Sequence, residues 1–200
     1  HLRIALIRPG LGPFETASLT CTEPYALALL AGLTPLDIEL AAFDDRFEEM
    51  PYDVPWDLVA LTVGTFQAKR AYQIADRFRR RGTAVALGGF HVTFCPDEAA
   101  CHADVLALGE AEGTWPNLIE DLRYGQLKPR YQYREPPTLA GIVARREVYA
   151  DKRYAPLHVI QFGRGCRFRC DFCCVRAFYR SDVRQRPVAE VVAEIEAAGA

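Results

Sequence analysis

Short apolar runs alternate with segments of helical spacing through the first 125 residues of the chain. Residues 2–7 form a nearly continuous apolar run, as in parallel strands that are buried on both faces. Similar apolar or alternating runs follow at 37–43, 57–63, 84–87 and 104–108. The apolar spacing and end signals of helices occur at 23–33, 66–81 and 114–124. Five strands alternating with helices predict an α/β domain with a five-stranded, parallel, doubly wound sheet.

The carboxyl edge of that sheet is the expected place for a ligand, because doubly wound sheets bind ligands outside the carboxyl ends of their strands. Glycine lies close to three of the predicted strand ends, at Gly64, Gly88 and Gly109. Glycine lets a ligand approach the main chain, so these positions together favour a flat or phosphate-bearing ligand. The alternative is that they only terminate the strand–helix units. No G-x-G-x-x-G follows the first strand, so the nicotinamide-binding fingerprint is absent.

The last third of the chain predicts a second unit. Residues 128–156 contain four prolines and many charges, and we interpret them as a linker. A strand at 157–162, a loop at 163–179 and an amphipathic helix at 188–198 together predict one βα unit. The expected organisation is a domain at 1–127, the linker at 128–156 and the truncated start of a second domain at 157–200. The next strand is expected to begin at the glycine-containing turn 199–200.

Composition and charge narrow the function classes. The 200 residues are 50% hydrophobic and 25% charged, which is typical of a globular protein and excludes intrinsic disorder. No apolar run reaches the roughly 20 residues of a membrane span, and no signal peptide opens the chain, so we expect a cytoplasmic protein. Residues 1–120 carry 9 Lys and Arg against 17 Asp and Glu, whereas 121–200 carry 15 against 9. This change of net charge from negative to positive indicates two functional units. The basic part lacks the interleaved aromatic residues of a nucleic-acid binder.

The cysteines point to a metal centre. Three of the seven are scattered, at Cys21, Cys95 and Cys101. The other four fall within nine positions, at Cys166, Cys170, Cys173 and Cys174. The first three of these have the spacing C-x3-C-x2-C and could hold three irons of a [4Fe-4S] cube, leaving one iron open to a small molecule. Structural zinc is the alternative, with Cys174 as a fourth ligand, although two adjacent cysteines are poorly placed to share one tetrahedral ion.

This loop resembles that of the radical S-adenosylmethionine (SAM) enzymes. Cys166, Cys170 and Cys173 match the family's three cysteines, and Phe172 matches the aromatic residue before the last of them. The resemblance implies that the open iron binds the amino and carboxylate groups of SAM. An electron from the cluster then cleaves SAM into methionine and a 5′-deoxyadenosyl radical, and Phe172 helps to seat the adenine. Cys174 is expected to be a bystander.

The first 125 residues resemble the cobalamin-binding domain that precedes the radical domain in the B12-dependent class. The matching stretches are Gly88-Gly89-Phe90-His91, Pro96-Asp97-Glu98 and residues 104–113, where a strand ends in Gly-Glu-Ala-Glu-Gly. The resemblance implies a Rossmann- or flavodoxin-like fold with a pocket for the nucleotide tail of cobalamin. The residues expected to line it are Thr62, Gly64, Gly88, Gly89, Gly109 and Glu110.

One departure from that class concerns the cobalt ligand. Many of these domains carry D-x-H-x-x-G after the first strand, and its histidine binds cobalt. Residues 8–14 contain no histidine, so we expect cobalamin without a protein histidine on cobalt. His91 lies at the same sheet edge, where a hydrogen-bonding or surface role is the more common alternative. The domain can also keep the fold without the cofactor.

The resemblance implies an enzyme similar to the anaerobic magnesium-protoporphyrin IX monomethyl ester oxidative cyclases. The expected reaction is oxidative cyclisation, or methylation of an unactivated carbon, in a small molecule such as a tetrapyrrole. An electron donor such as flavodoxin or ferredoxin is an expected partner. A radical barrel needs several βα units and the sequence predicts only one, so the alternative is a corrinoid-binding module without turnover. A third possibility is a zinc-stabilised α/β regulator. The sequence leaves three roles open for the seven arginines from 164 to 186. They bind a carboxylate-bearing substrate, they bind the acidic face of the first domain, or they are solvated.

Overall fold

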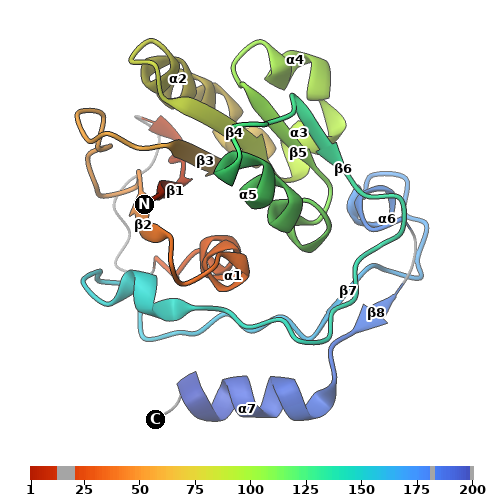
Figure 1. The fold of residues 1–200 in the computed structure, drawn as a ribbon. Coiled ribbons are helices and arrows are strands. Elements are labelled where there is room, and N and C mark those ends of the chain that lie inside the picture. The colour runs from red at the N-terminus through yellow and green to blue at the C-terminus, as the bar shows by residue number, and fades with distance from the viewer. Residues whose placement is uncertain (13–20, 181–182, 199–200) are drawn as a thin grey trace.

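A computed structural model describes residues 1–12, 21–180 and 183–198 of the chain (Figure 1). Its centre is a sheet of six strands that are all parallel. In spatial order these are β2 (Glu39–Asp44), β1 (Arg3–Arg8), β3 (Leu58–Thr62), β4 (Ala84–Gly88), β5 (Val105–Leu108) and β6 (Arg130–Gln132). The order reverses direction after β2, which makes the sheet doubly wound. The predicted fold class is therefore confirmed, with one strand more than the sequence indicates.

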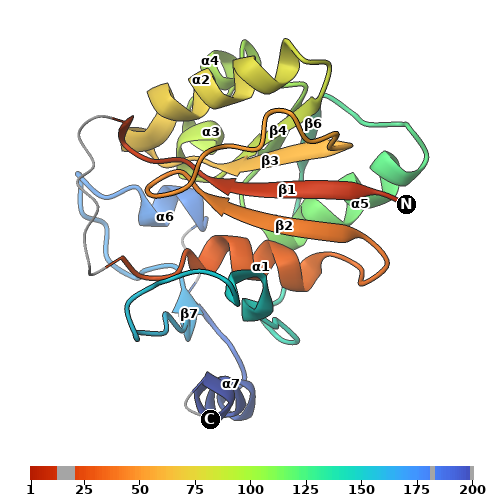
Figure 2. The same cartoon turned by 90° about the vertical axis from the view of Figure 1, so that its left-hand side faces the viewer.

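Helices cover both faces of this sheet (Figure 2). One face packs against α1 (Tyr25–Leu33) and α5 (Trp115–Arg123). The other packs against α2 (Ala68–Arg79), α3 (Phe90–Phe94) and α4 (Pro96–Ala100). The single-turn 3-10 segments are η2 (Thr65–Gln67), η3 (Ala111–Gly113) and η4 (Arg146–Tyr149). The three predicted helices are present, whereas the five-residue helices α3 and α4 are too short to show a helical period.

The burial of β1 explains why its sequence is apolar throughout. Ile4 and Leu6 pack into the core on the α1 and α5 face, and Ala5 and Ile7 into the core on the α2 face. All four are fully buried. A strand with a core on each face has no position for a polar side chain, which produces a continuous apolar run instead of an alternating one.

The segment 128–156, which we interpret as a linker, packs on the first domain. It supplies β6, where Tyr131 is buried and donates a hydrogen bond from its hydroxyl to Asp121 at 2.7 Å. Further along, the Tyr149 hydroxyl donates to the Pro24 carbonyl at 2.7 Å, and the Arg145 amide donates to the Ala28 carbonyl. Residues 128–156 therefore follow the sheet edge and then α1. This path places residues 163–179, the cysteine loop, beside the first domain.

The prediction of a strand at 157–162 is wrong. The described chain gives this segment no neighbouring strand to form a ladder, and its apolar side chains Leu157, Val159 and Phe162 are exposed. Pairing begins only at β7 (Gly163–Arg164), which is antiparallel to β8 (Arg184–Gln185). Between them lies the one-turn helix α6 (Val175–Phe178).

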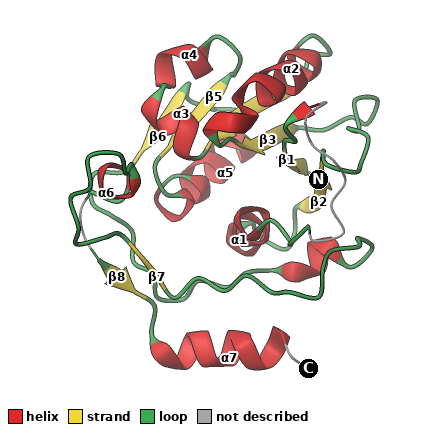
Figure 3. Ribbon diagram, turned by 180° about the vertical axis from the view of Figure 1, so that it is seen from behind, coloured by secondary structure: helices red, strands yellow, loops and turns green. Residues whose placement is uncertain are grey.

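The final helix α7 (Val188–Ala198) has the predicted bounds and lies apart from the sheet and its covering helices (Figure 3). Its apolar and acidic sides face opposite to the usual arrangement. Its acidic side faces the rest of the chain, because Glu194 pairs with Arg146 at 2.8 Å and with Arg186. Its apolar side, with Val188 and Ile195, is exposed. The turn expected at 199–200 lies outside the described residues. Within the described residues, no helix has the length and apolarity that a membrane crossing requires.

Candidate functional site

A cavity of about 200 Å³ opens at the carboxyl ends of β3, β4 and β5, on the face covered by α1 and α5. Its walls are mostly apolar, with Leu29 from α1, Ala86 from β4 and Trp115 from α5 among them. It also includes residues far along the chain, at Gln161, Arg164, Phe178 and Tyr179. The cavity is therefore completed by the segment that carries the cysteines, and the two predicted units share it.

Five of the six residues predicted to line a nucleotide pocket do line this cavity: Thr62, Gly88, Gly89, Gly109 and Glu110. Gly64 does not. It precedes η2, where a side chain would run into the Gln67 side-chain oxygen at 2.4 Å. The Gln67 side chain can move aside, so the structure shows no need for glycine at position 64, which sequence reasoning placed in the site because it follows a strand end.

Gly109 is fixed by its protein neighbours. Its φ is +87°, and a Cβ there would lie 2.7 Å from the Tyr133 ring. The Tyr133 hydroxyl accepts a hydrogen bond from the Glu110 amide at 3.2 Å, so this ring covers the turn after β5. Burial raises the pKa of Tyr133, which keeps the hydroxyl protonated. The glycine after β5 therefore allows the close approach of an aromatic ring from the segment 128–156.

Replacing Gly109 with alanine is expected to destabilise the fold more than the same change at Gly82. Both residues have left-handed backbones, with φ of +87° and +81°, which should cost roughly 1–2 kcal/mol each. Only Gly109 meets an obstacle, whereas a Cβ at Gly82 has open space. Overpacking against Tyr133 should add about 1–3 kcal/mol. Urea unfolding of both variants measures the difference, and equal midpoints would contradict the assigned role of Tyr133.

Arg164, two positions before Cys166, anchors the cysteine loop to the sheet edge. The Arg164 guanidinium donates to Glu110 at 2.7 Å and to both oxygens of Glu112, at 2.8 and 2.6 Å. These three side chains are only 5%, 1% and 7% exposed. Burial opposes the charge on Arg164, but the hydrogen bonds to Glu112 and Glu110 outweigh it and raise its pKa. Arg164 therefore stays charged, and its hydrogen bonds hold β7 against the turn after β5.

A second arginine binds the same turn. Arg184 of β8 donates to Glu110 at 2.5 Å and to the Pro137 carbonyl at 2.6 Å. Arg164 and Arg184 thus act in one of the roles expected for the arginines, because they hold the acidic face of the first domain. The charge step between the two parts of the chain was the sequence signal for this contact, although it did not name the partners.

The other end of the loop is held by aromatic stacking. Phe178 of α6 stacks on Phe90 with 3.9 Å between ring centroids and 13° between their planes. Tyr179 contacts both rings edge-on. Phe90 follows Gly89 at the end of β4, so this anchor also lies on the carboxyl edge of the sheet. Sequence reasoning did not identify Phe178, since a single phenylalanine in a loop gives no pattern.

The cysteines lie between these two anchors. Cys166 is half-buried, whereas Cys170, Cys173 and Cys174 are exposed. Phe172 is 93% exposed. A turn closes the loop, because the Cys173 amide donates to the Cys170 carbonyl at 3.1 Å. Among the described residues, these sulfurs do not form a group close enough to share a single ion.

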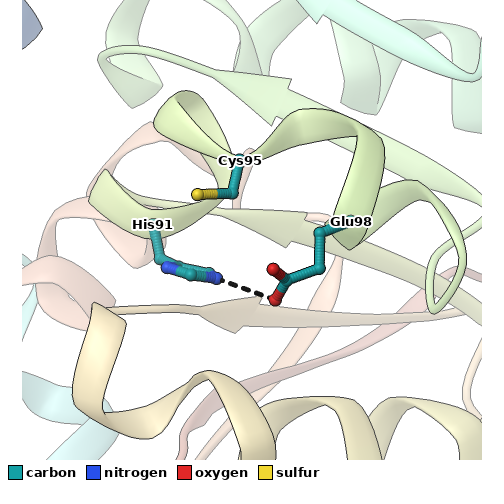
Figure 4. Close-up of side chains that lie close together, drawn as sticks. All are labelled: His91, Cys95 and Glu98. Carbon is teal, nitrogen blue, oxygen red and sulfur yellow. Dashed lines mark hydrogen bonds and ion pairs between the residues drawn. The ribbon is translucent and has the colours of Figure 1, made fainter.

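His91 is not among the residues that line the cavity, and its side chain contacts Tyr72 of α2 (Figure 4 shows His91 beside Cys95 and Glu98). Its Nε2 lies 3.1 Å from the Tyr72 hydroxyl and 3.2 Å from Glu98 Oε1. The hydrogen-bonding role is therefore the one observed. Of the stretch 8–14, in which no histidine occurs, Pro13 and Phe14 lie outside the described residues.

No family model matches the chain. It is 37% identical over 164 residues to bacteriochlorophyllide d C-8(2)-methyltransferase of Chlorobaculum tepidum, which covers 76% of this chain and 36% of that protein. It is 32% identical to bacteriochlorophyllide d C-12(1)-methyltransferase of the same organism, over 87% of the chain and 40% of that protein. The hopanoid C-2 methylase of Rhodopseudomonas palustris is 26% identical, over 86% of the chain and 34% of that protein. The chain therefore spans about a third to two fifths of the length of these three relatives, which are named as methyltransferases of bacteriochlorophyllide d and as a hopanoid methylase.

Proposed function

We propose that the chain is the cobalamin-binding and cluster-binding part of a radical SAM methyltransferase. The observation that carries this proposal is the position of the cysteine loop. Its two ends are fixed to the turns after β4 and β5, and these same turns line the cavity. A cluster on the loop and a ligand in the cavity would therefore be held next to each other by one set of contacts.

The cysteine loop fits an iron–sulfur cluster. Cys166, Cys170 and Cys173 supply three thiolates from one short segment, which is the ligand set such a cluster requires. Their partial or full exposure leaves room for the cluster and a small molecule on its open iron. Bound there, the cluster would supply the electron that cleaves SAM to methionine and a 5′-deoxyadenosyl radical. The exposed Phe172 is available to cover the adenine.

The cavity fits a flat, mostly apolar ring. At about 200 Å³ it is smaller than the roughly 300–1,000 Å³ of pockets for whole drug-sized ligands. A single ring system such as the base of a cobalamin nucleotide tail therefore suits it better than a complete corrinoid. Gly88 and Gly89 leave main-chain surface at the cavity wall, and the Glu110 carboxylate, engaged with Arg164 and Arg184, is not available to the ligand.

Methyl transfer is favoured over cyclisation because the relatives are named as methyltransferases. Two of them act on bacteriochlorophyllide d, so a tetrapyrrole is the first substrate class to test. Within this proposal, a flavodoxin or ferredoxin supplies the electron. The second candidate is a corrinoid-binding module without turnover. It is favoured because residues of this chain alone line the cavity, although the chain matches only 36% of the length of its relative.

The cavity assignment is tested by calorimetric titration with hydroxocobalamin under anaerobic conditions. Ala26 lies on α1, is exposed and lines the cavity, so a larger side chain there should block the opening without harming the core. We expect Ala26→Phe to weaken binding at least tenfold, or about 1.4 kcal/mol. Ala26→Ser, the matched control, should bind as the unchanged chain does.

Two outcomes separate the candidates. Binding that is lost in Ala26→Phe, together with 5′-deoxyadenosine release from a polypeptide of the relatives' full length, supports the methyltransferase. Binding without release supports the corrinoid-binding module. No binding, or equal binding by both Ala26 variants, contradicts the assignment of the cavity.

A further inference from the structure

Three potential metal ligands converge on the side of α3 that faces away from the cavity. They are His91 of α3, Cys95 at the junction of α3 and α4, and Glu98 of α4 (Figure 4). The helical path breaks at Cys95, whose φ is −126° and ψ 55°, so the junction of the two short helices brings the three side chains together. One nitrogen, one sulfur and one carboxylate oxygen from these residues all lie within 4.8 Å of one another. It is the single such group among residues 1–12, 21–180 and 183–198.

The distances are close to those of a tetrahedral site. Zinc–ligand distances of about 2.0–2.3 Å place the ligand atoms of a tetrahedron roughly 3.3–3.8 Å apart. The His91 Nε2 and Glu98 Oε1 are 3.2 Å apart, within about 0.1 Å of that range. The sulfur has to approach by at most about 1.3 Å, which rotation of the Cys95 side chain can provide.

The site is only partly enclosed by the protein. Cys95 is half-buried, and the Glu98 side chain is 56% exposed. His91 is 8% exposed, and the Tyr72 hydroxyl lies 3.1 Å from its Nε2, so an ion held by that nitrogen would replace this hydrogen bond. His102 stacks on Tyr72 and pairs with Asp76 at 2.9 Å.

We propose that His91, Cys95 and Glu98 bind a zinc ion, with the fourth position open to water. The mixture of imidazole, thiolate and carboxylate suits zinc, which tolerates all three ligand types. Binding releases the thiol proton of Cys95 to solvent and leaves the histidine neutral. The ion would join α3 to α4 and so fix the turn at Gly89 and Phe90, which lines the cavity on its other side. The site does not rest on the proposed function.

The experiment is a cobalt titration of the full chain in which Cys166, Cys170, Cys173 and Cys174 are serine. Cobalt replaces zinc in such sites and shows a thiolate charge-transfer band, which reports the sulfur ligand directly. We expect one cobalt per chain with this band, displaced by one equivalent of zinc. Cys95→Ser should lose the band. Cys101→Ser, at the nearest other cysteine and outside the group, should keep it.

Glu98→Gln tests the site without touching the sulfur. The Glu98 side chain is 56% exposed, so this variant should fold. It should keep the band and bind zinc at least about tenfold more weakly. No thiolate band in the parent, an unchanged band in Cys95→Ser, or unchanged zinc affinity in Glu98→Gln would each overturn the proposal. The Glu98 result decides the matter if Cys95→Ser does not fold.

Discussion

Replacing Arg164 with methionine is expected to release the amino-terminal end of the cysteine loop from the sheet edge. The change leaves Glu112 without its partner and Glu110 with Arg184 alone, while both carboxylates remain buried. Removing one member of a buried ion pair typically costs about 3–5 kcal/mol. Because the loop is held at its ends, this cost should appear as local opening and only partly as global unfolding.

Hydrogen exchange measures this opening. The informative amide is that of Arg186, which donates to the Phe162 carbonyl beside β7 at 2.9 Å. Its protection should fall by at least about a hundredfold, since 1.4 kcal/mol corresponds to a factor of ten. Arg167→Met is the control, because Arg167 is exposed in the same loop. Similar protection in both variants would show that the Glu110–Arg164–Glu112 contact does not hold the loop.

Replacing Phe178 with alanine is expected to release the other end. Phe178 is 6% exposed, stacks on Phe90 and forms part of the cavity wall. Removing a buried phenylalanine ring typically costs about 3–5 kcal/mol. The variant should therefore lose protection at α6 and bind hydroxocobalamin at least about tenfold more weakly, because the cavity loses a wall.

Phe168→Ala is the matched control for this prediction. Phe168 belongs to the same loop but is 61% exposed, so its removal should change neither quantity. The informative amides are those of Phe178 and Tyr179, which donate to the Cys174 and Val175 carbonyls. If α6 opens but hydroxocobalamin affinity is unchanged, the aromatic anchor holds the loop without belonging to the ligand site.

The sheet could be predicted where the sequence has a clear period. A run buried on both faces, such as β1, is apolar at every position, and α2 shows polar and apolar sides. In contrast, β6 has the sequence Arg-Tyr-Gln with only Tyr131 buried, so a three-residue strand gives no pattern. The segment 157–162 shows the reverse case, since its apolar residues indicate a strand but the described chain provides no partner strand.

The candidate site could likewise be predicted only where local sequence signals point to it. The glycines at strand ends and the cysteine spacing are local signals, and five of the six residues predicted for a pocket do line the cavity. The contact between Arg164 and Glu112 joins residues 52 positions apart, and only the fold brings them together. Tyr133 explains Gly109 in a similar way, because nothing near Gly109 in the sequence indicates an aromatic ring packed above it.

The most direct test of the proposed cluster is its iron and sulfide content after anaerobic reconstitution. The unchanged chain and Cys174→Ser should each hold about four irons and four sulfides, as expected for a [4Fe-4S] cube on three cysteines. Cys170→Ser should hold less than about one, because it removes a required ligand. Zinc without iron in the unchanged chain, or equal iron in Cys170→Ser, would contradict the assignment of Cys166, Cys170 and Cys173 as the cluster ligands.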